Sequence, residues 1–191
     1  VKRGKGKRGG DAERFVRQFF VNVSPQDCVE AAPDCLRGMT ASLWEFAQKR
    51  SPGDAKIRIF NPDANRDGWE AGHTVVEIVN DDMPFLVDSV TAELNRRNLT
   101  VHLIIHPVIG VVRGSAGKLN RITDDPKADD AAAESIMHLQ ITEQTDERGI
   151  KQLEKSLQRV LRDVRAAVED WRPMRVSIAS VIAELESTAP S

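Results

Sequence analysis

Residues 73–113 read HTVVEIVNDDMPFLVDSVTAELNRRNLTVHLIIHPVIGVVR, and this stretch decides the fold. The β-branched run at residues 75–79 predicts a strand, because it is too short to form a helix of its own. Residues 80–82 are polar and break that run. Apolar residues then recur at every fourth position and favour a helix with one buried face: Leu86, Val90 and Leu94. Residues 99–112 are β-branched and apolar again, so the stretch predicts a strand, a helix and a second strand.

The ends of this predicted helix carry recognisable signals. Asp82 is predicted to cap the first free N–H groups, and Pro84 is tolerated in a first helical turn. Asn98 is predicted to end the helix in a left-handed conformation. His106-Pro107 predicts a bend or bulge in the second strand. A crossover of this kind is nearly always right-handed and places its helix on one face of a sheet.

Toward the amino terminus, the pattern changes twice. Residues 1–10 hold five basic residues and four glycines, and we predict a disordered basic tail, with a nucleic-acid-binding arm as the less favoured reading. Residues 11–53 predict a helical segment whose second helix starts at Ser24-Pro25. Residues 56–60 alternate polar and apolar side chains and predict a half-exposed strand. Trp69, in the loop that follows, is expected to be a packing anchor.

Toward the carboxyl terminus, residues 114–126 predict a hairpin turn and a polar loop. Residues 136–142 alternate and predict another strand. Asp146 is predicted to cap the longest helix, in which apolar residues recur at helical spacing over about six turns. Pro173 marks a boundary or kink, so residues 173–191 are predicted to be a C-terminal helix or a linker.

These elements follow one another as β-β-α-β-β-α, which predicts an α+β fold. We predict a ferredoxin-like, four-stranded antiparallel sheet with two helices on one face over residues 54–172. Residues 56–60 supply the fourth strand beside the first. The other face of the sheet is expected to be covered either by the helical segment 11–53 or by a second copy of the domain.

Composition excludes several classes of protein. The chain has 191 residues, 40% hydrophobic residues, a mean hydropathy of -0.38 and a net charge of -2. We therefore expect one core, no partnership with nucleic acid and no membrane span or signal peptide. Cys28 and Cys35 do not form a CxxC pair and are expected to be reduced thiols in a cytoplasmic protein.

The residue pattern contains no recognisable reactive constellation. The adjacent side chains of Asp81 and Asp82 diverge, so they do not form a two-carboxylate site by themselves. His102 and His106 share one face of a strand but lie roughly 13 Å apart, too far to hold one metal ion. Ser-His-Asp and P-loop patterns are absent from the sequence, and the GxGxxG spacing of Gly4, Gly6 and Gly9 lies in the basic tail with no preceding strand, so it does not indicate a dinucleotide site. We therefore predict no catalytic residue, no cofactor-binding residue and no metal ligand in this chain.

The run FNPDANRDGWEAGHTVVEIVNDDMPFLVDSV at residues 60–90, followed by VHLIIHPVIGVVR at residues 101–113, resembles the amino-terminal region of the large bacterial NAD-specific glutamate dehydrogenases. The resemblance implies ACT-like regulatory domains, which are ferredoxin-like. It also implies that the parent enzyme oxidatively deaminates L-glutamate to 2-oxoglutarate with NAD, at catalytic and cofactor sites much further along. This segment is then itself non-catalytic, and its implied partners are other domains of the same chain, in a homo-oligomer.

ACT domains start a strand-to-helix turn with an Asp-x-Pro-Gly pattern, where the glycine leaves room for an amino-acid effector. This chain offers Asp82-Met83-Pro84 with Phe85 at the position of the glycine, and the bulky ring is expected to fill such a pocket. The candidate effector or interface turn consists of six residues: Asp81, Asp82, Met83, Pro84, Phe85 and Asp88. Three readings stay open: a regulatory or assembly module of the dehydrogenase, a self-standing amino-acid-binding module of ferredoxin-like fold, and a small enzyme whose site the residue pattern does not reveal.

Overall fold

The computed structural model describes residues 4–23 and 32–188. The helix predicted to start at Ser24-Pro25 therefore begins outside the described residues. The helices are α1 (Gly4–Phe19), α3 (Pro33–Ala47), α4 (Ala64–Asp67), α5 (Leu86–Arg96) and α6 (Glu147–Thr188). The strands are β1 (Lys56–Phe60), β2 (Thr74–Asp81), β3 (Val101–Ile105), β4 (Val108–Arg113), β5 (Leu119–Thr123) and β6 (Ala132–Ile141).

All strands join one antiparallel sheet in the order β1-β2-β6-β4-β5, with β3 also paired to β6. Strands β2 and β6 form its centre, and their register runs from Thr74 opposite Ile141 to Asp81 opposite Glu134. Strands β3 and β4 lie end to end along the other edge of β6, because β3 pairs with its second half and β4 with its first half. The stretch that decides the fold therefore borders β6 on both sides.

Two features of the sheet correct the sequence-based expectation. In the described part of the chain the sheet has six strands and not four. The strand expected over residues 99–112 is split into β3 and β4 at His106-Pro107, where the interruption was predicted, since Pro107 has no N–H for the ladder. Strand β5 was missed, because residues 119–123 were assigned to a polar loop. It forms a hairpin with β4 around a turn at residues 114–118, and that turn was predicted.

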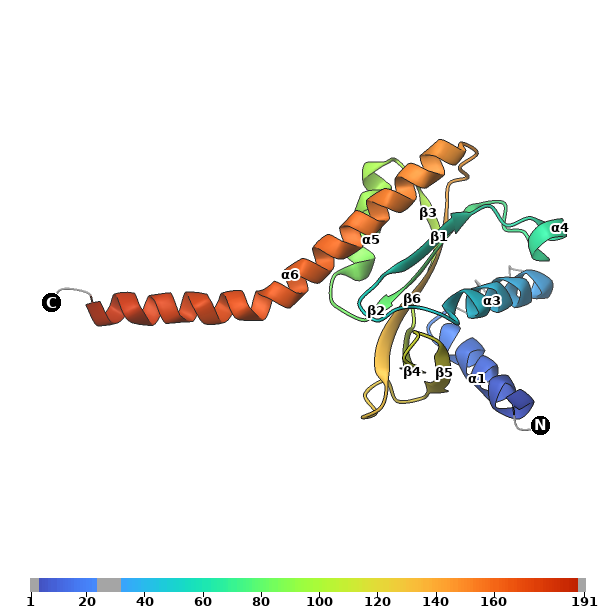
Figure 1. Ribbon diagram of the computed structural model, residues 1–191. Coiled ribbons are helices and arrows are strands. Elements are labelled where there is room, and N and C mark those ends of the chain that lie inside the picture. Colours follow the sequence, from blue (N-terminus) through green and yellow to red (C-terminus); the bar gives the residue numbers. More distant parts are fainter. Residues whose placement is uncertain (1–3, 24–31, 189–191) are drawn as a thin grey trace.

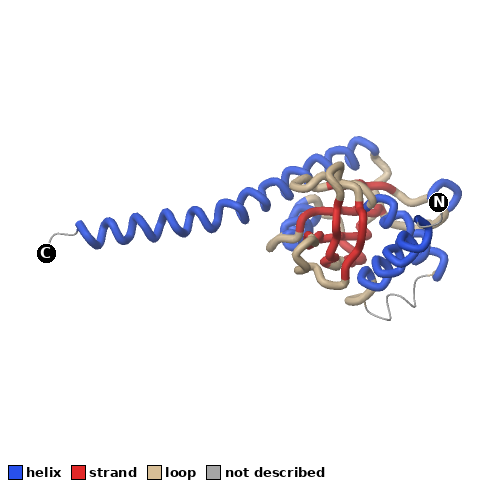
Figure 2. Tube along the Cα trace, turned by 60° about the horizontal axis from the view of Figure 1, so that its bottom comes forward, coloured by secondary structure: helices blue, strands red, loops and turns tan. Residues whose placement is uncertain are grey.

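The helices cover both faces of the sheet, as Figures 1 and 2 show. On one face, α5 and the first half of α6 pack on the alternate side chains of β2 and β6, such as Val76, Ile78 and Leu139. On the opposite face, α1 and α3 pack on Val75, Val79 and their neighbours. The helical segment predicted over residues 11–53 therefore covers this face, which was one of the two expected arrangements. Trp69 is 3% exposed within this second cluster, as expected of a packing anchor.

The helix ends agree with prediction at some positions and differ at others. Asp146 accepts hydrogen bonds from the backbone N–H groups of Arg148 and Gly149, each at 3.0 Å, so it caps α6 as predicted. Asn98 has the predicted left-handed backbone, with φ of 57°. The predicted cap by Asp82 is wrong, because α5 begins only at Leu86 and Pro84 lies in the preceding turn. Residues 4–10, predicted to be disordered, form the first turns of α1.

Helix α6 is the longest element, at 42 residues, and it continues through Pro173. Its first half lies on the sheet and α5, with Leu153, Leu157 and Leu161 buried. Its second half extends away from the rest of the described chain (Figures 1 and 2). Proline inside a helix removes one hydrogen bond and favours a kink, so the interruption expected at Pro173 is at most a bend.

Candidate functional site

The six residues of the predicted turn do not converge on one pocket. Asp81 ends β2 and points its carboxylate toward the charged side chains of Arg50 and Arg165. Met83 is half-buried against α5 and α6. The other four, Asp82, Pro84, Phe85 and Asp88, are exposed. Asp88 lies in the first turn of α5, where a negative charge is favourable next to the free N–H groups.

Phe85 corrects one expectation about this turn. Its ring is 67% exposed, so it does not fill a pocket. Its backbone is left-handed, with φ of 70°, a conformation that L-residues with side chains rarely adopt. The position thus keeps the backbone that glycine favours, although the residue is an aromatic. The ring stands beside Ser89 of α5 and four residues of α6, around a shallow groove of about 370 Å³.

Asp81 belongs to a chain of ion pairs that crosses the molecule. Its carboxylate accepts hydrogen bonds from Arg50 at 2.5 Å, from Arg165 at 2.8 Å and from the backbone N–H of Gly53 at 3.1 Å. Arg165 lies on α6 and also contacts Glu169 at 3.5 Å. Arg50 follows α3. The Asp81 carboxylate therefore connects the end of α3, through Arg50, to α6, through Arg165.

Glu134 of β6 is the buried centre of the same chain. Its side chain is 0% exposed, and its Oε1 accepts from Nη2 of Arg50 and from Nε of Arg113, each at 2.6 Å. Arg113 also donates to the backbone oxygens of Ala47, at 3.0 Å, and Gly117, at 2.9 Å. A buried carboxylate is costly unless it is paired and hydrogen-bonded, and here two guanidinium groups satisfy it.

These contacts shift the pKa values of Asp81 and Arg50. Burial by itself raises the pKa of the Asp81 carboxyl, but the hydrogen bonds and charges of Arg50 and Arg165 outweigh burial and hold this pKa below its ordinary value. Burial by itself lowers the pKa of Arg50, and Asp81 with Glu134 reverses that effect, so the pKa is raised. Asp81 and Arg50 are therefore both charged near neutral pH, which suits a structural clamp between elements.

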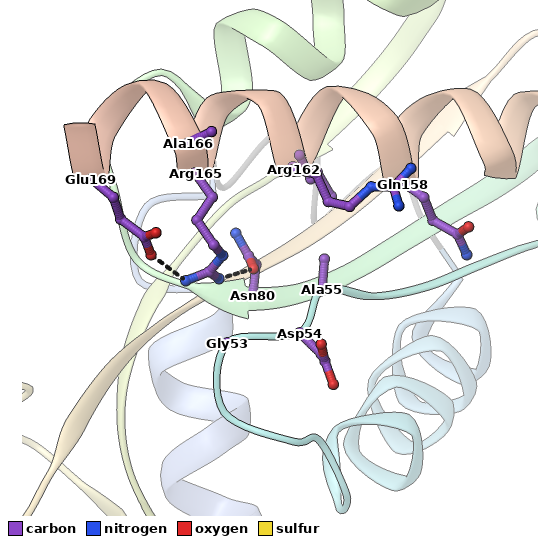
Figure 3. A pocket seen from close by; sticks show the side chains of 10 residues that line it. Gly53, Asp54, Ala55, Asn80, Gln158, Arg162, Arg165, Ala166 and Glu169 are labelled. Carbon is purple, nitrogen blue, oxygen red and sulfur yellow. Dashed lines mark hydrogen bonds and ion pairs between the residues drawn. The ribbon is translucent and has the colours of Figure 1, made fainter. Parts of the chain in front are cut away.

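A cleft of about 530 Å³ opens beside this network, between α6 and the segment that leads into β1 (Figure 3). Figure 3 shows Asn80 and Arg165 bonded at one end of the cleft and Gln158 at the other. Its wall carries cationic groups, Arg162 and Arg165, and anionic groups, Asp54 and Glu169. The Asn80 amide nitrogen is buried and has no hydrogen-bond partner among the described residues. The cleft thus offers partners for both charges of a small zwitterion.

Three histidines, His73, His106 and His138, are hydrogen-bonded rather than gathered as ligands. His106 contacts the Ser135 hydroxyl at 2.6 Å, and burial lowers its pKa despite the opposing charge of Asp82. His138 is buried and contacts Glu77 at 3.2 Å. The rings of His73 and His102 lie 4.3 Å apart between centroids, a pairing that spacing in the sequence did not reveal. Within residues 4–23 and 32–188, no group of three His, Cys, Asp or Glu side chains could hold a metal ion.

Among the described residues, Cys35 is a free cysteine. None of the helices in the described part of the chain is both long and apolar enough to cross a membrane.

Sequence reasoning missed Arg50, Arg113 and Glu134, because charged residues are usually solvated and single positions give no sign of burial. Only the pairing of β2, β4 and β6 brings Asp81, Arg113 and Glu134 together. Arg165 was assigned to the polar face of its helix. The one usable signal was the charge at position 134, two residues before the strand predicted over residues 136–142.

Comparison with known proteins gives a consistent result. The family described as "Glutamate dehydrogenase, ACT1 domain" matches residues 15–157. The NAD-specific glutamate dehydrogenase of Halomonas elongata is 38% identical over 186 residues, which is 96% of this chain and 12% of that protein. The enzyme of the same name from Pseudomonas aeruginosa is 34% identical over 171 residues, 88% of this chain and 10% of that protein. The corresponding enzyme of Mycobacterium tuberculosis is 27% identical over 154 residues, 79% of this chain and 9% of that protein. The chain thus spans about a tenth of the length of these relatives.

Proposed function

Because this chain belongs to the family of glutamate dehydrogenase ACT1 domains, we propose that it serves as a regulatory and assembly domain and performs no catalysis itself. The parent enzyme would oxidatively deaminate L-glutamate to 2-oxoglutarate with NAD, at sites in other domains of the same chain. The observation that carries this proposal is the family match over residues 15–157 together with relatives roughly ten times longer. We place the parent in the cytoplasm, in line with the free thiol of Cys35.

The geometry supports a structural role for this domain. Two of its buried charges, Arg50 and Glu134, are paired with each other and with Arg113 and Asp81, so they hold elements together. The same network ends on α6 at Arg165, the helix that leads out of the domain. A change at the network would therefore reach α6 directly.

We further propose that part of the sheet is a ferredoxin-like core. Strands β1, β2, β6 and β3 follow one another in space, and α5 and α6 share one face of them. Strand β1 comes from the front of the chain and pairs with β2, as the predicted arrangement requires. In this proposal, β4 and β5 are an extension at the edge next to the α1 side of the molecule.

Amino-acid binding is the second candidate function, and the cleft in Figure 3 favours it. An α-carboxylate needs cationic or amide donors, which Arg162 and Asn80 provide, and an α-ammonium group needs a carboxylate, which Asp54 or Glu169 provides. This role fits either an effector site of the dehydrogenase or a self-standing binding module.

Thermal unfolding in the presence of single amino acids tests this second function. An amino acid at a hundred times its dissociation constant should stabilise the chain by about 2.7 kcal/mol. The Arg162→Gln variant should lose that gain, while Arg159→Gln, which changes an exposed arginine of the same helix outside the cleft, should keep it. An unchanged melting temperature with every amino acid at millimolar concentration would rule out amino-acid binding and leave assembly.

The non-catalytic assignment has its own test. We expect the purified chain to form no NADH from glutamate and NAD, whatever its state of assembly.

A further inference from the structure

The second half of α6 carries a continuous apolar stripe. Its members are spaced alternately three and four residues apart, which is the heptad pattern of helices that pair side by side. From the domain outward they are Val164, Ala167, Trp171, Met174, Ile178, Val181 and Leu185. Val164 is buried against the domain, so the stripe begins as part of the core and then leaves it.

Beyond the domain the stripe is exposed. Trp171 is 59% exposed, Met174 55%, Ile178 56% and Val181 55%. Ile182 and Leu185 are 50% and 63% exposed beside them. A single helix of this length is marginal in water, and its stability ordinarily comes from packing its apolar face. Exposed apolar patches of this size usually mark a contact surface.

We propose that this stripe pairs with the same stripe of a second copy of the chain, as an antiparallel two-helix seam. Three observations favour a second copy as the occupant. The first is area: the six exposed side chains present roughly 600 Å² per copy, so two copies bury about 1,200 Å², which reaches the lower limit of specific stable interfaces.

The second observation is the match of the stripe to itself. When two helices run in opposite directions about position 176, Trp171 faces the partner's Val181, and Met174 faces the partner's Ile178. Ala167 then faces the partner's Leu185. Each layer joins a larger side chain to a smaller or more flexible one, which favours interdigitation.

The third observation is the groove that this register reaches. The tip of the partner helix arrives at Ala167 and Val164, which line the 370 Å³ groove beside Phe85. The exposed ring of Phe85 is then covered by the second copy. The pairing therefore accounts for the apolar stripe and for the aromatic residue that stands strained and exposed in the turn before α5.

This inference deepens the assembly part of the proposed function and rests on it. Its failure is distinguishable from failure of the non-catalytic assignment, because the state of assembly is read by sedimentation and catalysis by NADH formation.

Sedimentation equilibrium of the 191-residue chain tests the seam. We expect a dimer at micromolar concentration. Ile178→Asp places a charge in the seam and should weaken dimerisation by about a hundredfold or more. The matched control is Val176→Asp, since Val176 lies on the opposite side of the same helix and is 71% exposed. It should weaken dimerisation by less than about threefold.

Circular dichroism of each variant separates loss of pairing from loss of folding, because the domain should melt cooperatively in both. The orientation is tested by mixing Met174→Cys with Ile178→Cys under oxidising conditions and mapping the disulfides. Antiparallel pairing should give the mixed disulfide, and a parallel seam would give same-site disulfides. A monomer at every concentration, an Ile178→Asp dimer as tight as the control, or same-site disulfides would overturn the proposal.

Discussion

Replacing Arg50 by methionine removes the cation that joins Asp81 to Glu134, at nearly constant volume. The Arg50 side chain is 2% exposed and donates to Asp81, to Glu134 and to the backbone oxygens of Ser51 and Asp54. Breaking a buried pair usually costs about 3–5 kcal/mol, because the remaining charge stays buried without a partner. Here Glu134 keeps Arg113 at 2.6 Å, and Asp81 keeps Arg165 at 2.8 Å. We therefore expect the lower end of the range, about 3 kcal/mol.

For a chain of this size, about 3 kcal/mol lowers the melting temperature by roughly 6–12 °C. Differential scanning calorimetry at one fixed protein concentration measures this shift with the contribution of assembly held equal in both proteins. The control is Arg121→Met, because Arg121 pairs with Asp130 at the surface, where the two side chains are 45% and 65% exposed. That variant should change stability by no more than about 0.5 kcal/mol. A loss below about 1 kcal/mol for Arg50→Met, or a loss equal to that of the control, would refute the structural importance of the network.

Three further outcomes follow from the same structure. The folded-state pKa of Asp81 is depressed, so the stability that its carboxylate contributes is complete above the ordinary aspartate pKa and is lost as pH falls below it. The difference in unfolding free energy between wild type and Asp81→Asn, measured by urea unfolding, should therefore be constant from pH 7 to about 5 and should close below about 4. Gly117→Ala should lower the free energy of unfolding by at least about 2 kcal/mol, because φ is 72° and the added Cβ would clash with the backbone oxygen of Arg50. Gly53→Ala, with φ of 81° and open space around it, should lower it by about 1 kcal/mol in the same measurement. Phe85→Gly, made in the Ile178→Asp background to exclude pairing, should raise stability by up to about 1 kcal/mol, because glycine adopts the left-handed backbone without strain. A loss above about 1 kcal/mol would show instead that the Phe85 ring is packed.

The local elements could be predicted from sequence because their signals are local. β-branched runs, spaced apolar residues and an Asp cap gave β2, α5 and α6 within a few residues, and Pro107 gave the break between β3 and β4. Strand β5 escaped because Asn120 and Arg121 interrupt its apolar pattern, and as an edge strand it pairs only with β4. Its identity depends on a partner and not on its own residues.

The candidate site was predicted only in part. Asp81 was chosen as a member of the candidate effector or interface turn, and the structure puts it at a junction of charges. Its partners lie 31 and 84 positions away in the chain, so nothing in the local pattern points to them. The left-handed backbone of Phe85 was equally hidden, because sequence rules expect glycine or asparagine in that conformation.

If this domain supports chemistry performed in other domains, it should not catalyse the reaction itself. The rate of NADH formation by the purified chain with glutamate and NAD tests this most directly. We predict no formation above that of a protein-free sample, at protein concentrations where the chain is folded by circular dichroism. A rate that depends on glutamate and rises in proportion to the chain's concentration would contradict the assignment.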